Sequence, residues 1–517
     1  MSRKIPPSEL KAWAALHGYD LPSPTLHEFT RLADEVLQTV GELDSIKDPW
    51  PASNEKDRTV ELRDNCSDDP LNAVLRWCSG VSRKGATGPL TGKRVGLKDT
   101  ISVAGLPLTG GTKLLEGFVP SRDSSVVDRI LDAGGEIVAL LNMDYLGFAA
   151  GGDSSSYGPT RCPYDITRTA GGSSSGSAAA LHYPEIDVTL GCDQGGSIRI
   201  PAAWCGVIGL KPTHGLVPYT GILGIDQLID HVGPLGRTVF DIAQMLEVIA
   251  GADGHDPRQV GAPGPGRYVE AASIPKDSLE GARIGVLAEG FGQGAGVDAT
   301  VADRVRRVTG TLAQLGAHVV EVSVAEHLHA GPIAYAIYME GMAALMSAGG
   351  NGYQWRGRYW PELASFMATA IPERSEDLSD QLKLVLACGS YLQSQTRGAA
   401  YARAVNRQPV LTAAYDRALS SVDYLVMPTC PSLPYPIDPT LSIYERVKRG
   451  WGVLANTGQF NLTGHPAISL PLAEVDGLPV GVMFVSRMYA EEALLDLAGT
   501  LENLLGWVPS GPLGPQL

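Results

Sequence analysis

Residues 170–213 read AGGSSSGSAAALHYPEIDVTLGCDQGGSIRIPAAWCGVIGLKPT and contain two clusters in which paired glycines precede a serine, at 171–173 and 195–197. Glycine–serine runs usually form linkers. The second cluster, however, continues as an apolar stretch that is typical of buried chain. A serine behind two glycines suits amide hydrolysis, because glycine lets backbone N–H groups approach a substrate carbonyl closely. The apolar continuation argues against a linker and leaves a buried serine nucleophile as the alternative interpretation.

Other motifs accompany these clusters along the chain. They are VGLKDT (95–100), IDHVGPLGRT (229–238), VMPTCPSLPYP (426–436) and FNLTGHPAISLPL (460–472). Together with GGSSSG and DQGGSIRIPAAWCGVIGLKPT they resemble the amidase signature family. The similarity is strong over about residues 90–240 and weaker beyond. It implies cleavage of a carboxamide with no metal and no cofactor.

The resemblance implies a catalytic triad of Lys98, Ser173 and Ser197, with a cis peptide bond between Gly172 and Ser173. A buried Lys98 has a lowered pKa and acts as a neutral base. Ser173 relays the proton between Lys98 and Ser197, which forms an acyl-enzyme. The oxyanion hole is expected at the backbone amides of Gln194, Gly195, Gly196 and Ser197.

Two positions depart from the usual family pattern. Gln194 stands where many members have threonine, and Ser175 stands where glycine is frequent. Both variants, and a long helical N-terminus, are similar to a bacterial subgroup that hydrolyses aromatic and aliphatic amides, often beside nitrile-degrading enzymes.

The substrate pocket is less well defined by the sequence. NMDYLGF (142–148) departs from the usual NMDEF, so Tyr145 and Phe148 are expected near the pocket. The other substrate-binding candidates are Ser174, Asp193, Trp451 and Asn456. The sequence does not identify the acyl group or the leaving amine.

Other activities stay open as alternatives. GSSSG (172–176) matches G-x-S-x-G, the nucleophile elbow of α/β-hydrolases, with Ser174 at its centre and His465 as a possible base. The preceding RCPYDITRTAGG contains a proline and few apolar residues, so it does not predict the strand that an elbow needs. The amidotransferase subunit that acts on misacylated transfer RNA shares the family fold, and carbamate, anilide or ester cleavage needs only the same triad.

The chain divides into four expected parts. Residues 1–85 read as helical, with apolar positions at helical spacing over 26–41, and are expected to support dimerisation. Residues 86–323 form the first part of the core, 324–410 a helical cap rich in aromatic residues and methionine, and 411–517 the second part of the core.

Within the core, short strands alternate with helices. RVGLKD (94–99) is a strand candidate, SSVVDRILDAGG (124–135) reads as a helix stopped by two glycines, and a buried strand follows at 136–141. The pattern recurs over 282–324. Such alternation predicts an α/β fold, with a mixed sheet covered by helices on both faces.

Net charge, hydropathy and cysteine pattern limit the kinds of partner that the protein is expected to bind. The 517 residues carry a net charge of −15, which argues against nucleic acid or an anionic membrane. No run of about 18 apolar residues and no signal peptide are evident, so a cytoplasmic protein is expected. The seven cysteines include no C-x-x-C pair, which favours neither a disulfide framework nor a zinc site. The expected partners are a small-molecule amide and a second copy of the chain.

Overall fold

The computed structural model describes residues 4–47, 50, 58, 60–63, 69–292, 296–350, 352–353 and 356–507. The chain splits into two compact units, Met1–Ala52 and Ser53–Leu517. Cys66 and most of the polar stretch between 48 and 68 lie outside the described residues.

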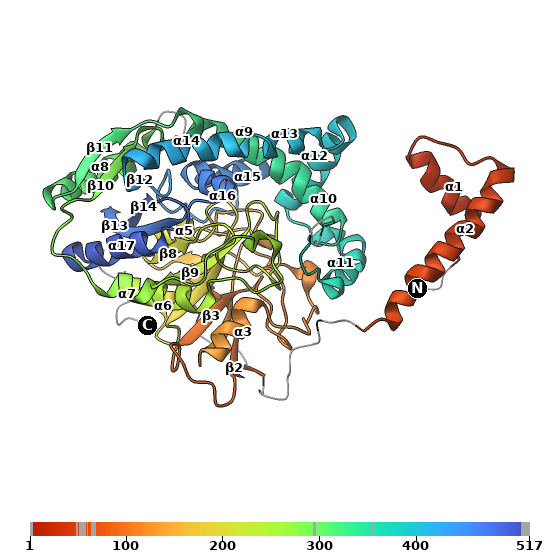
Figure 1. Cartoon of the computed structure of the whole chain (residues 1–517), viewed down its shortest axis with the longest axis horizontal. Coiled ribbons are helices and arrows are strands. Elements are labelled where there is room, and N and C mark those ends of the chain that lie inside the picture. The colour runs from red at the N-terminus through yellow and green to blue at the C-terminus, as the bar shows by residue number, and fades with distance from the viewer. Residues whose placement is uncertain are drawn as a thin grey trace. The chain divides into compact units, whose positions relative to one another are not determined.

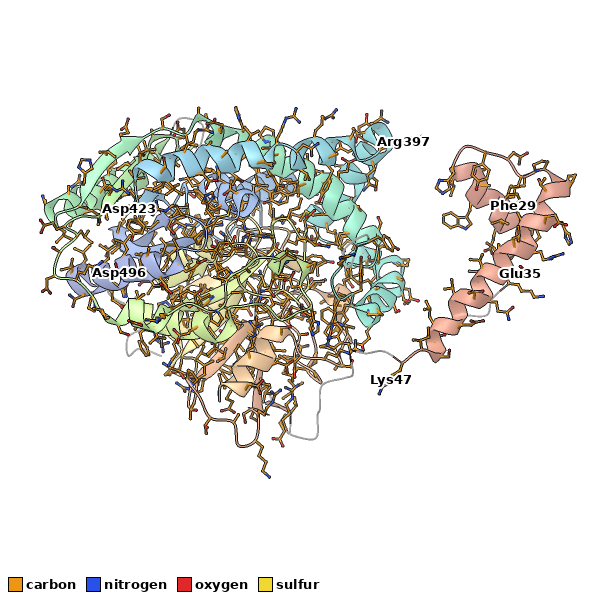
Figure 2. The ribbon with its side chains drawn as sticks, viewed as in Figure 1. Phe29, Glu35, Lys47, Arg397, Asp423 and Asp496 are labelled. Carbon is orange, nitrogen blue, oxygen red and sulfur yellow. The ribbon has the colours of Figure 1, made fainter. Side chains whose placement is uncertain are left out.

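The first unit is helical. It consists of α1 (Pro7–Leu16), α2 (Ser23–Gly41) and the 3-10 helix η1 (Glu42–Ser45). The backbone N–H of Ile5 donates to the Asp34 carboxylate at 3.1 Å, which ties the start of the chain to α2. Of its large apolar side chains, Leu21 is buried, whereas these are exposed (Figure 2 labels Phe29): Trp13, Leu16, Tyr19, Phe29, Leu32, Val36, Val40, Leu43 and Ile46.

The second unit is built on a mixed sheet in the order β1-β2-β4-β3-β7-β9-β8-β13-β14-β12-β10-β11. Its strands are β1 (Glu61–Arg63), β2 (Val74–Val81), β3 (Arg94–Lys98), β4 (Glu136–Leu141), β7 (Val188–Asp193), β8 (Ile208–Lys211), β9 (His231–Gly236), β10 (Arg283–Leu287), β11 (His318–Val322), β12 (Tyr424–Pro428), β13 (Ala467–Val475) and β14 (Leu478–Val485). β3 runs parallel to β4 and β7, and β10 runs parallel to β11 and β12. The remaining neighbours in the order are antiparallel. A separate hairpin pairs β5 (Arg161–Cys162) with β6 (Asp165–Thr169).

Helices cover both faces of the sheet (Figure 1). The described α-helices of the second unit that lie wholly or mostly outside the segment 324–410 are α3 (Ser125–Asp132), α4 (Ser175–Ala179), α5 (Arg199–Cys205), α6 (Val239–Ile249), α7 (Tyr268–Ser273), α8 (Ala299–Gln314), α14 (Gln408–Ser421), α15 (Ile443–Gly452), α16 (Gln459–Thr463) and α17 (Glu491–Leu505). α6 packs against α3, α7 and α17, whereas α4 packs against α5, and both α4 and α6 contact β7 and β9. The predicted fold class is therefore confirmed.

Short 3-10 helices connect these elements. They are η3 (Lys113–Leu115), η4 (Tyr145–Gly147), η5 (Ala180–His182), η6 (Pro257–Gln259), η7 (Ala288–Phe291) and η11 (Val453–Asn456). Among the described helices of both units, none combines the length and the apolar character needed to cross a membrane.

The segment expected as a cap is helical. It contains η8 (Ala325–His329), α9 (Ala330–Ala336), the π-helix η9 (Ile337–Gly341), α10 (Met342–Ser347), α11 (Pro361–Glu373), η10 (Ser375–Asp377), α12 (Asp380–Thr396) and α13 (Ala399–Val405). α10, α11 and α12 lie at the opposite end of the second unit from β10 and β11 (Figure 1). Arg397 caps the C-terminal end of α12 (Figure 2).

Local predictions were right where glycines mark the ends of elements and wrong near the N-terminus. The predicted strand, helix and strand at 94–141 correspond to β3, α3 and β4. The helical assignment of residues 1–85 is wrong at 61–63 and 74–81, which are strands. β2 pairs with β1 on one side and β4 on the other, and only Cys78 and Val81 of β2 are buried. Its side chains therefore lack the clean alternation that reveals a strand in sequence.

Candidate active site

Lys98 is the last residue of β3, and its side chain is surrounded by protein instead of water. Its side chain is 1% exposed. Nζ donates to Ser173 Oγ at 2.6 Å and lies 3.4 Å from the carbonyl oxygen of Cys192. Burial lowers the pKa of Lys98, and the nearby Cys192 and Asp144 only partly oppose that effect. A neutral amine able to accept a proton is thereby favoured next to the Ser173 hydroxyl.

Ser173 is held in a buried loop before α4. The peptide bond between Gly172 and Ser173 is cis, as the resemblance implied. The Ser173 carbonyl accepts from the backbone N–H of Asp144 at 3.1 Å. The Asp144 carboxylate accepts in turn from the N–H of Gly152 at 2.9 Å, and a Cβ on Gly172 would collide with it. The loop therefore fits closely around the backbone that presents the Ser173 hydroxyl.

Ser197 lies in the loop between β7 and α5 and is 3% exposed. Its carbonyl accepts from the backbone N–H of Ser174 at 3.1 Å, which joins the two serine clusters. Within the described residues its hydroxyl has no hydrogen-bond partner in the protein. Ser197 lines a pocket, so its hydroxyl is available to a ligand.

Three backbone amides of this loop are also available as donors. Within the described part of the chain, the N–H groups of Gly195, Gly196 and Ser197 have no acceptor in the protein. All three residues are buried. Buried N–H groups without partners are rare in folded proteins, and a ligand oxygen is the usual reason for them at a hydrolytic site.

A pocket lies beside Ser197. Its lining is mostly apolar and comes from both the core and the cap: Gly147, Phe148, Ala149, Ala150, Gln194, Gly195, Ser197, Ile225, Tyr338, Met342, Val385, Trp451 and Leu454. The Trp451 indole donates to the carbonyl of Phe148 at 2.9 Å, so two predicted pocket residues support each other.

Two other predicted pocket residues do not line the pocket. Tyr145 and Asn456 are buried and outside the lining. The Asn456 amide donates to the carbonyls of Gly290 and Pro428, both at 2.9 Å, which gives it a structural position.

Ser174 is engaged by the backbone of β7. Its hydroxyl donates to the carbonyl of Cys192 at 3.0 Å and accepts from the N–H of the same residue at 3.2 Å. His465 contacts Asp416 at 3.1 Å and Thr463 at 2.9 Å instead of Ser174. This arrangement gives no support to the α/β-hydrolase alternative.

Asp193 binds residues at the far end of the loop and does not line the pocket. Its carboxylate accepts from the N–H of Ile198 at 3.1 Å and pairs with Arg199 at 2.9 Å, with both side chains fully buried. The Arg199 charge offsets the burial of Asp193 and lowers its pKa to about 2. The ion pair therefore joins the two ends of the segment that carries Ser197.

Sequence reasoning missed several lining residues. Ile225 follows a turn in the core, and Tyr338, Met342 and Val385 come from the cap. The only indication of the cap residues was the richness of 324–410 in methionine and aromatic side chains. Among the described residues, no three His, Cys, Asp or Glu side chains are grouped so as to hold a metal ion.

Comparison with known proteins decides the family. The Amidase family model matches residues 61–495. The chain belongs to the amidase family. It is 40% identical over 524 residues to an enantioselective amidase of Rhodococcus rhodochrous, covering 99% of this chain and 98% of that relative. It is 35% identical to a subunit of the glutamyl-tRNA(Gln) amidotransferase of Methanosarcina mazei, over 83% of this chain and 88% of the relative.

A solved structure agrees with this assignment. The native peptide amidase of Stenotrophomonas maltophilia aligns with a TM-score of 0.66 at 27% identity, covering 83% of this amidase and 86% of that chain. This amidase is therefore an enzyme that hydrolyses amide C–N bonds.

Proposed function

We propose that this amidase converts a small carboxamide to the carboxylic acid and ammonia or an amine through an acyl-enzyme on Ser197. The observation that supports this most strongly is the buried Lys98, whose Nζ lies 2.6 Å from Ser173 Oγ beside a pocket lined by Ser197. A buried amine in contact with a hydroxyl is suited to general-base catalysis, not to a surface ion pair.

In the proposed mechanism, Ser173 passes the Ser197 hydroxyl proton to neutral Lys98 as Ser197 Oγ attacks the amide carbon. The N–H groups of 195–197 stabilise the oxyanion that forms. The proton returns through Ser173 to the leaving nitrogen, and the C–N bond breaks to give the acyl-enzyme. Water, deprotonated along the same path, then attacks the ester and releases the acid.

The pocket supports an apolar acyl group. Phe148, Met342, Val385, Trp451 and Leu454 surround the space next to Ser197, and they offer no charge to a polar acyl chain. The relative from Rhodococcus rhodochrous is an enantioselective amidase, which supports a compact, shape-selective acyl site of this kind.

We further propose that the first unit mediates a homodimer in the cytoplasm, and that residues 324–410 act as a cap on a core formed by 86–323 and 411–517. The exposed apolar side chains of α1 and α2 support the dimer, because exposed apolar patches of this kind mark interaction surfaces. Among the described residues, Cys162, Cys192, Cys205, Cys388 and Cys430 are free thiols, which suits a reducing compartment.

The test is to label the enzyme with a fluorophosphonate and locate the adduct by peptide mass spectrometry. An adduct on Ser197, absent in Ser197→Ala, is expected. An adduct on Ser174 instead would contradict the proposal, since it would place the activated serine one loop away.

A further inference from the structure

The carbonyl oxygens of the loop before α5 are all engaged on the side away from the three free amides. Tyr338 Oη donates to the Gln194 carbonyl at 3.0 Å, and Thr457 Oγ1 donates to the Gly195 carbonyl at 2.5 Å. The N–H of Ile200 donates to the Gly196 carbonyl at 2.8 Å. Each peptide unit of the loop is therefore held by its oxygen.

Holding the oxygen of a peptide unit also aims its hydrogen. A trans peptide is planar, and its C=O and N–H point in opposite directions. The Tyr338 hydroxyl therefore sets the direction of the Gly195 N–H, and the Thr457 hydroxyl sets that of the Gly196 N–H. Hydrogen bonds in a chain also polarise one another, so each N–H becomes a better donor when its carbonyl accepts.

The two glycines leave room for these hydroxyls. A Cβ on Gly195 would meet Tyr338 Oη at 2.8 Å, and a Cβ on Gly196 would overlap Thr457 Oγ1. Glycine at both positions thus permits the two side-chain hydroxyls to reach the backbone.

The two donors come from different parts of the unit. Tyr338 belongs to the π-helix η9 of the cap, and Thr457 follows η11 of the core. Burial raises the pKa of Tyr338, so its hydroxyl keeps its proton and stays a donor. The Gln194 side chain is fixed separately, since its amide donates to Tyr219 Oη at 2.8 Å.

From this geometry we infer that Tyr338 and Thr457 are positioning residues that aim the Gly195 and Gly196 amides at the substrate oxyanion, an inference that rests on the proposed acyl-enzyme at Ser197. Neither hydroxyl needs to touch the substrate. Each acts through a carbonyl on the opposite side of a peptide plane.

The experiment measures phosphonylation of full-length enzyme by a fluorophosphonate, whose phosphoryl oxygen occupies the oxyanion position. Saturation kinetics give the inactivation rate constant kinact and the binding constant KI for Tyr338→Phe, Thr457→Val and Thr457→Ser. Loss of a direct oxyanion donor costs about 100- to 1,000-fold, so loss of a positioning hydroxyl is expected to lower kinact by about 10- to 100-fold. KI is expected to stay near the wild-type value, and Thr457→Ser, which keeps the hydroxyl, is expected to recover most of the kinact lost in Thr457→Val.

The matched control is Tyr401→Phe, which removes a different hydroxyl of the cap. Tyr401 Oη donates to the Asp226 carboxylate at 3.0 Å and not to a carbonyl of the loop. A loss of kinact in Tyr401→Phe equal to that in Tyr338→Phe would overturn the inference, because it would reflect general anchoring of the cap. A raised KI with unchanged kinact, or unchanged kinetics in Tyr338→Phe and Thr457→Val, would also overturn it.

Failure of the proposed function gives a different result. If wild-type enzyme is not labelled at Ser197 at all, the acyl-enzyme proposal falls and the positioning role falls with it. If wild-type enzyme is labelled and the hydroxyl variants react at the wild-type rate, only the positioning inference is wrong.

Discussion

Burial changes what a lysine can do, and Lys98 illustrates this at the scale of one residue. An exposed lysine is protonated at neutral pH and cannot accept a proton. Burial lowers the pKa of Lys98, so the neutral amine is populated at a lower pH than in water. Activity should therefore be lost as the pH falls through this lowered pKa, and should reach a plateau above it.

Replacement of Lys98 by alanine tests the base directly. Lys98→Ala is expected to slow fluorophosphonate labelling of Ser197 by about 100- to 10,000-fold and to remove the acidic limb of the pH profile. The control is Lys93→Ala. Lys93 directly precedes β3, is partly exposed and pairs with Asp241. Wild-type labelling rates in Lys98→Ala, with an unchanged melting temperature, would exclude this lysine as the base.

The Asp193–Arg199 pair has its main effect on stability. Arg199→Met leaves the Asp193 carboxylate buried without its partner, which typically costs about 3–5 kcal/mol. The pKa of Asp193 is lowered to about 2 in the folded protein, compared with about 3.9 in the unfolded chain. The ionised carboxylate therefore stabilises the folded protein fully above about pH 3.9, and this stabilisation is lost as the pH falls through about 2.

Urea unfolding at pH 7 measures this effect. Arg307→Met, which breaks an exposed pair with Asp303 on α8, is the control and should change the free energy of unfolding far less. Equal losses in the two variants would show that burial of the first pair has no particular consequence.

At the scale of elements, helices α10 and α12 supply part of the pocket that Ser197 lines. Val385 lies on α12 and lines the pocket, whereas its neighbour Leu384 is 40% exposed. Val385→Ala is expected to raise kcat/KM for amides with larger acyl groups relative to smaller ones, because it removes two methyl groups from the wall. Assays of acetamide, isobutyramide and benzamide measure the ratio, and Leu384→Ala should leave it unchanged. The opposite shift in Val385→Ala would contradict an acyl site beneath the cap.

Elements differed in how well they could be predicted. α3 and β4 were predictable because helical periodicity ends at two glycines before a continuous apolar run. β2 was not, because it lies between a short edge strand and β4 and buries few side chains.

The residues of the candidate site also differ in how well they could be predicted from the sequence. Lys98, Ser173 and Ser197 lie in glycine-rich motifs that can be recognised locally. Tyr338 and Val385 enter the pocket from helices far along the chain, so no local pattern identifies them. The surroundings of Asp193 could not be predicted, because an acidic residue next to a catalytic motif looks the same in sequence whether it faces a substrate or a buried arginine.

At the scale of the whole molecule, the first unit carries an apolar surface of its own. Deleting residues 1–52 is expected to leave the second unit folded, because that unit contains the whole sheet, and to convert a dimer to a monomer. Analytical ultracentrifugation gives the mass of each form.

A point substitution provides the matched control for the deletion. Phe29→Glu, at a residue on α2 that is 50% exposed, should weaken the dimer without shortening the chain. A deletion variant that stays dimeric would place the interface elsewhere in the molecule.

The close approach of Tyr338 to Gly195 has an evolutionary consequence. An alanine Cβ at 195 would meet the Tyr338 hydroxyl oxygen at 2.8 Å and Leu454 Cδ2 at 3.2 Å, so removing the hydroxyl relieves the closer of the two contacts. The two positions should therefore be epistatic, with Gly195→Ala less costly after Tyr338→Phe than before it. Among descendants of this chain, the first step already slows the enzyme, so selection should preserve both residues although the Tyr338 hydroxyl acts only through the peptide between residues 194 and 195.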